Sequence, residues 1–305
     1  MFSVSIVVPN YNHGRFLERR LESIFGQTFQ DFEVIILDDC STDNSREIIE
    51  SYRNNPKVSA IVYNQFNSGS PFKQWNKGIH LAKGEYIWIA ESDDFCEPCF
   101  LETLVAALRS SDNCALAFFS DSDIDGDGRL MSDWRKTGKN VLYKGSSFII
   151  KELLLGNIVY NASCVVFKRA IALQLSNQWQ NSRGAGDYWF WVLMAKKGDA
   201  YSLGHSLASR RIHDSNVTSG ANSSGSNLKD ERLIVNYIYD TCRIAVWRKI
   251  LAENLRRRRV HAEKFDNEGI RAELLSIWTY GSKLGTLPEL ITKVYYKLRK
   301  FNILT

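Results

Sequence analysis

Short apolar runs alternate with segments of helical period through the first 95 residues of the chain. Four runs are rich in β-branched and aromatic residues and show little polar alternation, which is typical of strands buried on both faces of a parallel sheet. These runs are Ser3–Val8, Phe32–Leu37, Val58–Tyr63 and Tyr86–Ala90. The segments between them carry apolar residues at helical spacing, over Arg15–Phe25, Ser45–Tyr52 and Phe72–Ala82. This order predicts a doubly wound α/β sheet with right-handed crossovers.

The pattern is less regular after residue 95. We expect a helix over Glu97–Leu108, strands over Ala115–Phe119 and Val159–Phe167, and a hairpin turn at Asp125–Gly128. A helix through Lys197 and closing strands at 201–203 and 209–212 follow. The stretch 215–227 is rich in Ser, Asn and Gly and marks a boundary. Helices are predicted over 228–258, 270–284 and 288–300. The chain therefore divides into a domain at 1–215, with halves 1–95 and 96–215, and a helical region at 228–305.

The fourth apolar run stops abruptly in acidic residues, at Glu91, Asp93 and Asp94, with no Lys or Arg beside them. Ligands of open α/β sheets bind just outside the carboxyl ends of the strands. Adjacent carboxylates at such a point repel one another unless a cation joins them, and a divalent metal carrying a phosphate suits their oxygens. A solvated acidic loop, or a cap for the next helix, is the alternative reading.

Composition and motifs exclude several classes of protein. The chain has 305 residues, of which 44% are hydrophobic and 24% charged, as in a soluble globular protein. No window approaches the apolar length of a membrane span, and the first residues do not resemble a signal peptide. The six cysteines need not form disulfides, so we expect a cytoplasmic protein. The sequence contains neither a GxGxxG after the first strand nor a P-loop, which disfavours dinucleotide and P-loop sites.

Positive charge is concentrated in the last quarter of the chain. Residues 230–305 hold 15 Lys and Arg against 9 Asp and Glu, whereas the rest hold 24 against 25. The apolar residues Leu233, Trp247 and Leu251 alternate there with the basic run Arg256–Arg259. This pattern suits peripheral attachment to an anionic membrane, on the inner face of the plasma membrane. A helical subdomain with a solvated charged face is the alternative. No nucleic-acid partner is expected.

Five short motifs occur in an order and spacing that resemble a known family. They are Ile6–Asn12, Leu37–Asp43, Asn76–Ile79, Gly84–Ile87 and Ser92–Asp94. Together they look like an inverting glycosyltransferase of family 2, and the likeness covers about residues 1–215. The resemblance implies a GT-A fold, which is a doubly wound mixed sheet with a Rossmann-like nucleotide half and an acceptor half. The C-terminal helical appendage is outside it.

The resemblance also implies roles for particular residues. Pro9, Asn10 and Tyr11 would line the nucleotide pocket, and Asp38 would bind the base, usually uracil. Asp93 would contact the ribose. A Mn²⁺ or Mg²⁺ ion that bridges the donor diphosphate would be bound by Asp94.

Two further residues match the family in the second half of the domain. Asp187 corresponds to the general base, which the family normally writes as Glu-Asp at the head of a helix, but Gly186 stands in the place of the Glu. His213 lies in a segment that matches the one near the diphosphate and metal. From the residues alone, Asp187 could be a helix N-cap and His213 a surface histidine.

These observations predict a metal-dependent inverting glycosyltransferase. It would move a sugar from a nucleoside diphosphate donor, which the resemblance implies to be a UDP-sugar, to a hydroxyl of a glycan or lipid-linked acceptor in surface polysaccharide or glycolipid synthesis. A positioned carboxylate is needed because a hydroxyl is a poor nucleophile at neutral pH. The alternatives are a sugar-phosphate nucleotidyltransferase and a non-catalytic module that binds a sugar nucleotide or glycan.

Overall fold

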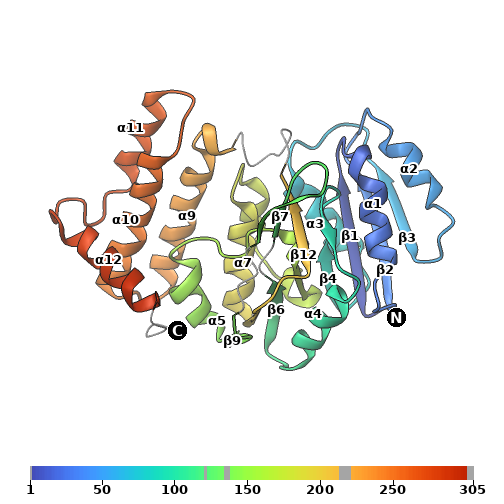
Figure 1. Cartoon of the computed structure of the whole chain (residues 1–305), viewed down its shortest axis with the longest axis horizontal. Coiled ribbons are helices and arrows are strands. Elements are labelled where there is room, and N and C mark those ends of the chain that lie inside the picture. The colour runs from blue at the N-terminus through green and yellow to red at the C-terminus, as the bar shows by residue number, and fades with distance from the viewer. Residues whose placement is uncertain (1, 120–121, 134–137, 213–220, 301–305) are drawn as a thin grey trace. The chain divides into compact units, whose positions relative to one another are not determined.

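The computed structural model describes residues 2–119, 122–133, 138–212 and 221–300, and its chain forms two compact units. The first comprises residues 1–148, 158–181 and 186–213, and the second comprises 149–157, 182–185 and 214–305. Figure 1 shows the first as a sheet with helices on both faces and the second as a group of helices.

An eight-stranded mixed sheet forms the centre of the first unit. In spatial order its strands are β3 (Val58–Tyr63), β2 (Phe32–Asp38), β1 (Val4–Asn10), β4 (Tyr86–Ile89), β10 (Val165–Lys168), β6 (Cys114–Phe119), β11 (Asp199–Leu203) and β9 (Val141–Tyr143). Strands β1 to β4 are parallel, and β10 is antiparallel to both β4 and β6. The doubly wound mixed sheet predicted from the sequence is confirmed.

Helices cover both faces of this sheet, which is why β1, β2, β4 and β6 are buried along their whole length. The helices of the unit are α1 (Gly14–Phe25), α2 (Ser45–Ser51), α3 (Pro71–Leu81), α4 (Phe100–Arg109), α5 (Gly145–Phe148), α6 (Arg169–Ala172) and α7 (Gly186–Lys197). On one face, Ile6 and Val8 share a buried cluster with Leu17 of α1. On the other face, α3 approaches β1 so closely that a Cβ at Gly78 would lie 2.2 Å from Val7 Cγ1.

A smaller four-stranded sheet lies beside the carboxyl end of β4. Its order is β5 (Phe95–Cys96), β12 (Ala208–Arg211), β7 (Ser122–Ile124) and β8 (Leu130–Asp133). The predicted hairpin turn joins β7 to β8, where the backbone N–H of Gly128 donates to the carbonyl of Asp125.

Two sequence-based boundaries in this unit are wrong. The segment 159–164 is not strand, because Asn161 caps a 3₁₀ turn, Ala162–Cys164, by accepting from the backbone N–H of Ser163. Helix α4 begins at Phe100 rather than at Glu97, since residues 97–99 form a turn between β5 and the helix, in which the backbone N–H of Phe100 donates to the carbonyl of Glu97. A second 3₁₀ turn, Asn177–Asn181, precedes α7.

The second unit is helical. It contains a short π-helix (Ile149–Leu153) and the helices α9 (Ser226–Thr241), α10 (Val246–Ala262), α11 (Glu268–Ile277) and α12 (Leu287–Lys300). The single helix predicted over 228–258 is wrong, because the chain becomes extended at Cys242 and Ala245 and divides into α9 and α10. No helix in the described part of the chain is long and apolar enough to cross a membrane.

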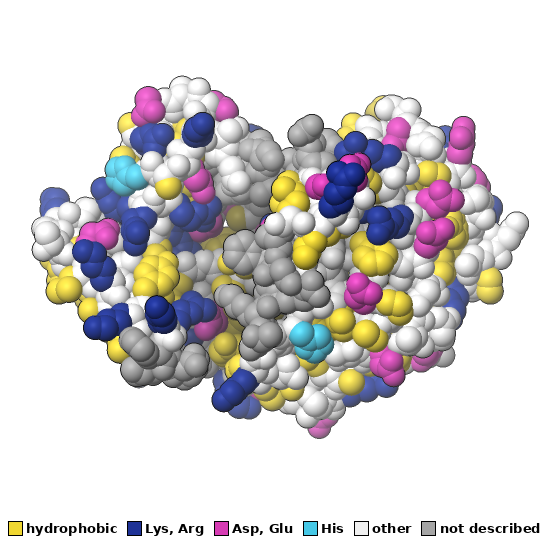
Figure 2. All heavy atoms as spheres, viewed as in Figure 1, with side chains coloured by type: hydrophobic (Ala, Val, Ile, Leu, Met, Phe, Trp, Pro, Cys, Tyr) yellow, Lys and Arg dark blue, Asp and Glu magenta, His cyan; other side chains and the backbone are white. Residues whose placement is uncertain are grey.

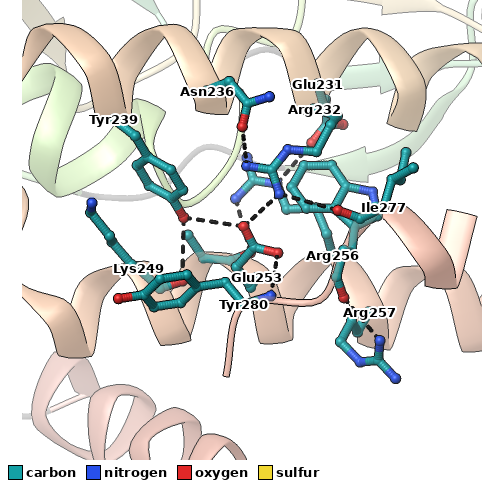
Figure 3. Close-up of polar contacts among 12 residues, drawn as sticks. Glu231, Arg232, Asn236, Tyr239, Lys249, Glu253, Arg256, Arg257, Ile277 and Tyr280 are labelled. Carbon is teal, nitrogen blue, oxygen red and sulfur yellow. Dashed lines mark hydrogen bonds and ion pairs between the residues drawn. The ribbon is translucent and has the colours of Figure 1, made fainter. Parts of the chain in front are cut away.

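Buried ion pairs hold α9 and α10 together (Figure 3). Glu231 accepts from Arg256 Nε at 3.0 Å and from Arg259 Nη1 at 2.5 Å, and Glu253 accepts from Arg232 Nη1 at 2.6 Å. Burial alone would raise the pKa of Glu231, but the charges of Arg256 and Arg259 hold that pKa below its ordinary value. Part of the basic run therefore has an internal structural role.

Candidate active site

The carboxyl ends of β1 and β2 bring together the residues expected to bind a nucleotide. Asn10 and Asp38 are paired across the two strands. Asn10 Nδ2 donates to Asp38 Oδ1 at 3.0 Å, and the backbone N–H of Ser41 donates to Asp38 Oδ2 at 3.0 Å. Pro9 lies on the same strand, and the ring of Tyr11 just beyond it is 46% exposed. Each Asp38 oxygen keeps a lone pair, because each accepts one of these bonds.

Two residues beside this pair have left-handed backbones, Asn12 with φ of 55° and Cys40 with φ of 67°. Residues other than glycine seldom adopt these backbone angles, and the few that do cluster at functional sites. Asn12 Oδ1 accepts from the backbone N–H of Thr42 at 2.7 Å, and Ser41 Oγ accepts from the Asn12 N–H at 2.9 Å. The loops after β1 and β2 are thereby fixed to each other.

Asp39 and Asp43 serve local structure. Asp39 accepts from Asn64 Nδ2, from Gln74 Nε2 and from the N–H and hydroxyl of Ser68, which fixes the loop after β3. Asp43 accepts from the first backbone N–H of α1 at 2.8 Å and of α2 at 3.0 Å. Burial opposes the ionised form of Asp43, but these hydrogen bonds hold its pKa below its ordinary value.

The acidic residues after β4 carry surplus negative charge. Asp93 and Asp94 are 9% and 4% exposed, and Glu91 is only partly exposed. Burial and the charge of Asp93 raise the pKa of Asp94 to about 6 and that of Glu91 to about 8. The protein therefore supplies too little positive charge to hold the pKa values of Glu91 and Asp94 at their ordinary levels. A bound cation would remove this penalty.

Segments distant in the sequence hold Asp94 in place. Asn161 Nδ2 donates to Asp94 Oδ2 at 2.7 Å, and the backbone N–H of Arg211 donates to Asp94 Oδ1 at 3.0 Å. Arg211 also donates from Nε to the carbonyl of Asp93 at 2.9 Å and from Nη1 to two carbonyls of the β7–β8 turn. The small sheet is thereby tied to the acidic residues.

The positive side chain of a fully buried arginine, Arg20, lies close to these acidic residues. Arg20 of α1 has no exposed surface, and its guanidinium carbon lies 4.8 Å from the centroid of the Trp88 ring. Its Nη2 donates to Ser163 Oγ at 3.2 Å, and the same oxygen accepts from the backbone N–H of Glu91 at 3.0 Å. The positive charge of Arg20 acts to lower the pKa values of Asp94 and Glu91, against burial.

Trp75 of α3 links the acidic residues to α7. Its Nε1 donates to Glu91 Oε1 at 2.7 Å. The centroid of its ring lies 6.2 Å from those of both Phe190 and Trp191, and 6.4 Å from that of Trp179. Three aromatic residues of α7, Tyr188, Phe190 and Trp191, are fully buried.

Asp187 lies in the first turn of α7 and is partly exposed. The residue before Asp187 is a glycine for a steric reason. A Cβ at Gly186 would lie 2.5 Å from Phe72 Cδ2 and 2.6 Å from the carbonyl oxygen of Trp179. The Glu that the family resemblance leads one to expect at this position does not fit this packing. Its absence therefore reflects the aromatic neighbours of the helix and leaves Asp187 as the acidic residue of this turn.

The donor set after β4 fits a hard divalent cation. Asp93 and Asp94 provide carboxylate oxygens with excess negative charge, which is what Mg²⁺ and Mn²⁺ prefer. Among the described residues, no three His, Cys, Asp or Glu side chains are arranged to hold a metal by themselves. His213, the other candidate ligand, lies outside the described residues. Phosphate oxygens commonly complete such sites.

Sequence reasoning missed four residues that shape this site, namely Arg20, Trp75, Asn161 and Ser163. A charged residue at a position of α1 that faces the core is the one available signal, because a buried Arg needs compensation. The other three have no distinguishing pattern.

Comparison with known proteins agrees with this geometry. Residues 5–174 match the family model described as glycosyl transferase family 2. The chain is 28% identical over 217 residues to the putative teichuronic acid biosynthesis glycosyltransferase TuaG of Bacillus subtilis, covering 71% of this chain and 81% of that protein. It is 34% identical over 155 residues to the poly(ribitol-phosphate) β-N-acetylglucosaminyltransferase TarS of Staphylococcus aureus, covering 49% of this chain but only 26% of TarS.

Solved structures show the same fold. The structure of S. aureus TarS residues 1–349 in complex with UDP-GlcNAc matches with a TM-score of 0.70 at 21% identity, covering 91% of this chain and 80% of that one. The mannosyltransferase PcManGT from Pyrobaculum calidifontis, in complex with GDP-Man and Mn²⁺, matches with a TM-score of 0.53 at 12% identity, covering 98% and 75%. The expected GT-A architecture is confirmed.

Proposed function

The chain belongs to glycosyl transferase family 2, and on that premise we propose that it moves a sugar from a UDP-sugar donor to a hydroxyl acceptor, with inversion and with the help of a divalent metal. The acceptor would be a growing glycan or a lipid-linked saccharide, in the synthesis of a surface polysaccharide or glycolipid. TuaG and TarS, two relatives of the chain, have names from surface-polymer synthesis. Peripheral contact with an anionic membrane stays a prediction.

The observation that carries this proposal is the meeting of two kinds of group at one sheet edge. The hydrogen-bonded pair of Asn10 and Asp38 ends β1 and β2, and the acidic residues Asp93 and Asp94 follow β4, which is the neighbour of β1. A nucleoside offers donors and acceptors to the first pair, and its diphosphate needs a cation at the second. We therefore assign Pro9, Asn10, Tyr11 and Asp38 to the nucleotide, and Asp93 to the ribose.

Asp187 is proposed as the general base. The acceptor hydroxyl oxygen forms a bond to the anomeric carbon while the bond from that carbon to the diphosphate oxygen breaks. The hydroxyl proton passes to the Asp187 carboxylate, and the nucleoside diphosphate leaves with the bonding electron pair. Such proton transfer contributes roughly 10²–10⁴-fold to the rate. A single displacement of this kind inverts the anomeric centre.

Asp94 would hold the metal, with His213 as the second protein ligand. A bound Mn²⁺ or Mg²⁺ would supply positive charge to the departing diphosphate. Asn161 and the Arg211 backbone would keep the Asp94 carboxylate oriented, and the surplus negative charge of the acidic residues favours binding of the ion.

Thermal unfolding with UDP, GDP, dTDP, CDP or ADP, each with and without Mn²⁺, tests the donor site. Ligand that binds only the folded protein stabilises it by about 2.7 kcal/mol at a hundred times its dissociation constant. We expect a metal-dependent rise in the melting temperature with UDP that exceeds the rise with the other nucleotides. No rise with any nucleotide would contradict a donor site at this edge. Donor binding without transfer to any acceptor would instead favour a non-catalytic binding module.

A further inference from the structure

Helix α12 packs with one side against α10 in the helical unit. Its Pro288, Thr292 and Tyr295 are buried. Asn254 of α10 donates from Nδ2 to Thr292 Oγ1 and to Glu289 Oε1, both at 2.9 Å. These contacts fix the rotation of α12 about its own axis, so the side that faces away from α10 is defined.

The outer side of α12 carries an apolar stripe. Leu287, Leu290 and Val294 are 41%, 58% and 47% exposed. Their spacings of three and four residues place them on one line along the helix. Leu284, in the turn before the helix, is 47% exposed as well. Four large apolar side chains in one short segment differ from the scattered exposed residues of an ordinary surface.

A row of lysines runs beside this stripe. Lys293, Lys297 and Lys300 are exposed. They are spaced by four and three residues, so they form a second line along the helix, beside the apolar one. The acidic residue of the helix, Glu289, is held by Asn254 of α10. Arg299 is directed elsewhere, since its Nη2 pairs with Glu152 at 3.1 Å. Figure 2 shows Lys and Arg side chains interspersed with hydrophobic ones over the part of the surface where Figure 1 places α10 and α12.

Helix α10, the most basic helix by sequence, does not present such a face along its length. Val246 and Trp247 at its start are 62% and 38% exposed, but Ile250, Leu251 and Val260 further along are buried. Arg256 is 1% exposed and pairs with Glu231, and Leu251 is fully buried. Leu251 and Arg256, which the sequence placed in an amphipathic pattern, therefore make contacts inside the helical unit. Helix α12 is the helix that combines a line of exposed apolar side chains with a line of exposed lysines, the two features that favour binding to an anionic membrane.

We propose that α12 is a membrane-docking helix that lies in the plane of an anionic bilayer. Leu287, Leu290 and Val294 would enter the boundary between headgroups and acyl chains, and the lysine row would contact lipid phosphates. The inference concerns the helical unit and does not depend on the identity of the sugar donor. A second copy of the chain is a poor occupant, because a two-fold pairing of the stripe would bring two lysine rows together.

Flotation of the full chain with vesicles tests the proposal. We expect binding to phosphatidylcholine vesicles that contain phosphatidylglycerol, weaker binding to phosphatidylcholine alone, and loss of binding as the salt concentration rises. The double change Lys293→Gln with Lys297→Gln should weaken binding roughly 30-fold, since each basic residue near an anionic surface contributes about fivefold. Leu290→Gln should weaken it about tenfold, because one leucine side chain then stays out of the apolar layer.

Matched controls come from the same unit. Leu233 of α9 is 63% exposed, and Lys264 is exposed between α10 and α11. Leu233→Gln and Lys264→Gln should leave binding unchanged. All variants should keep the melting temperature and the nucleotide-dependent thermal shift of the parent, so that a loss of vesicle binding is separate from a failure of the donor site.

Three outcomes would overturn the proposal. The first is no binding to anionic vesicles, and the second is equal loss in the control variants. The third is a parent that is dimeric in light scattering and becomes monomeric in Leu290→Gln, which would assign the stripe to contacts between copies of the chain.

Discussion

Buried carboxylates occur in both units of this chain, and they are treated in opposite ways. In the helical unit, Glu231 is paired with Arg256 and Arg259, and its pKa is held below the ordinary value. At the sheet edge, burial and mutual repulsion raise the pKa of Glu91 to about 8 and that of Asp94 to about 6. The first arrangement is balanced within the protein. The second keeps excess negative charge, which protonation or a bound cation would relieve.

This difference separates structural from functional acid groups. Removing one partner of a balanced buried pair leaves an uncompensated charge and costs stability. Removing one member of a repelling group relieves strain and costs binding or catalysis instead. Substitutions in the two units should therefore move different measurements.

The largest effect is expected for Asp187→Asn at the head of α7. We predict a fall in turnover of about a thousandfold, because the amide does not accept the proton of the acceptor hydroxyl. Donor affinity and melting temperature should be unchanged, as measured by nucleotide titration and thermal unfolding. Asp112→Asn, at an exposed position before β6, is the matched control. Unchanged turnover in Asp187→Asn would remove this residue from the chemistry.

The next largest effect is on stability, for Glu231→Gln in the helical unit. Arg256 is 1% exposed and would be left without its counter-charge, so we expect a loss of about 3 kcal/mol in the free energy of unfolding. Urea unfolding measures this loss. Glu273→Gln is the control, because Glu273 pairs with Lys229 at the surface and should cost less than about 1 kcal/mol. Similar losses of unfolding free energy for the two changes would mean that the buried ion pair contributes no more to stability than the surface pair.

Asp94→Asn should show the opposite behaviour. We expect the metal-dependent part of the UDP thermal shift to disappear and turnover to fall at least about 100-fold. The free protein should lose less stability than Glu231→Gln does, because the removal of one of the mutually repelling charges offsets the one hydrogen bond, from Asn161 or from the Arg211 backbone, that the amide nitrogen cannot accept. Asp127→Asn in the exposed β7–β8 turn is the control. A destabilised Asp94→Asn protein that retains its metal response would place Asp94 among the structural carboxylates.

The sheet and its acidic edge could be predicted because both depend on short stretches of sequence. Apolar runs such as Tyr86–Ala90 identify strands by composition, and polar groups at their ends meet because parallel strands share an edge. The cradle of Asp94 could not be predicted. Asn161 and Arg211 come from segments 67 and 117 residues away, and nothing local marks them as its partners.

The limits of the sequence are different in the helical unit. A basic run such as Arg256–Arg259 has the same pattern whether its side chains are solvated or buried against acids, so the inward direction of Arg256 was not visible. The break between α9 and α10 was missed because Cys242–Ala245 contains no Gly, Pro or Asn to mark a turn. At Gly186 the departure from the family was visible, but its cause, the ring of Phe72, was not.

The smallest expected effect, counted per pH unit, is a pH dependence of stability that has opposite signs in the two units. An acid whose pKa is raised by folding holds its proton longer in the folded state, so its ionisation penalty grows with pH. For Glu91 the free energy of unfolding should fall as pH rises from its ordinary value of 4.5 toward about 8, by at most about 1.4 kcal/mol per pH unit. Glu231, with a lowered pKa, contributes stability above 4.5 that is lost as pH falls.

Urea unfolding of the metal-free chain between pH 5.5 and 7.5 measures this slope. Glu91→Gln should flatten it, since the neutral side chain no longer gains charge in that range, and Trp75 Nε1 can still donate to the amide oxygen. Addition of Mn²⁺ and UDP to the parent should also flatten it, because bound cations compensate the carboxylates of the edge. The absence of this slope in the parent would mean that the acidic edge is already balanced by protein charges, and the contrast between the two units would fail at its source.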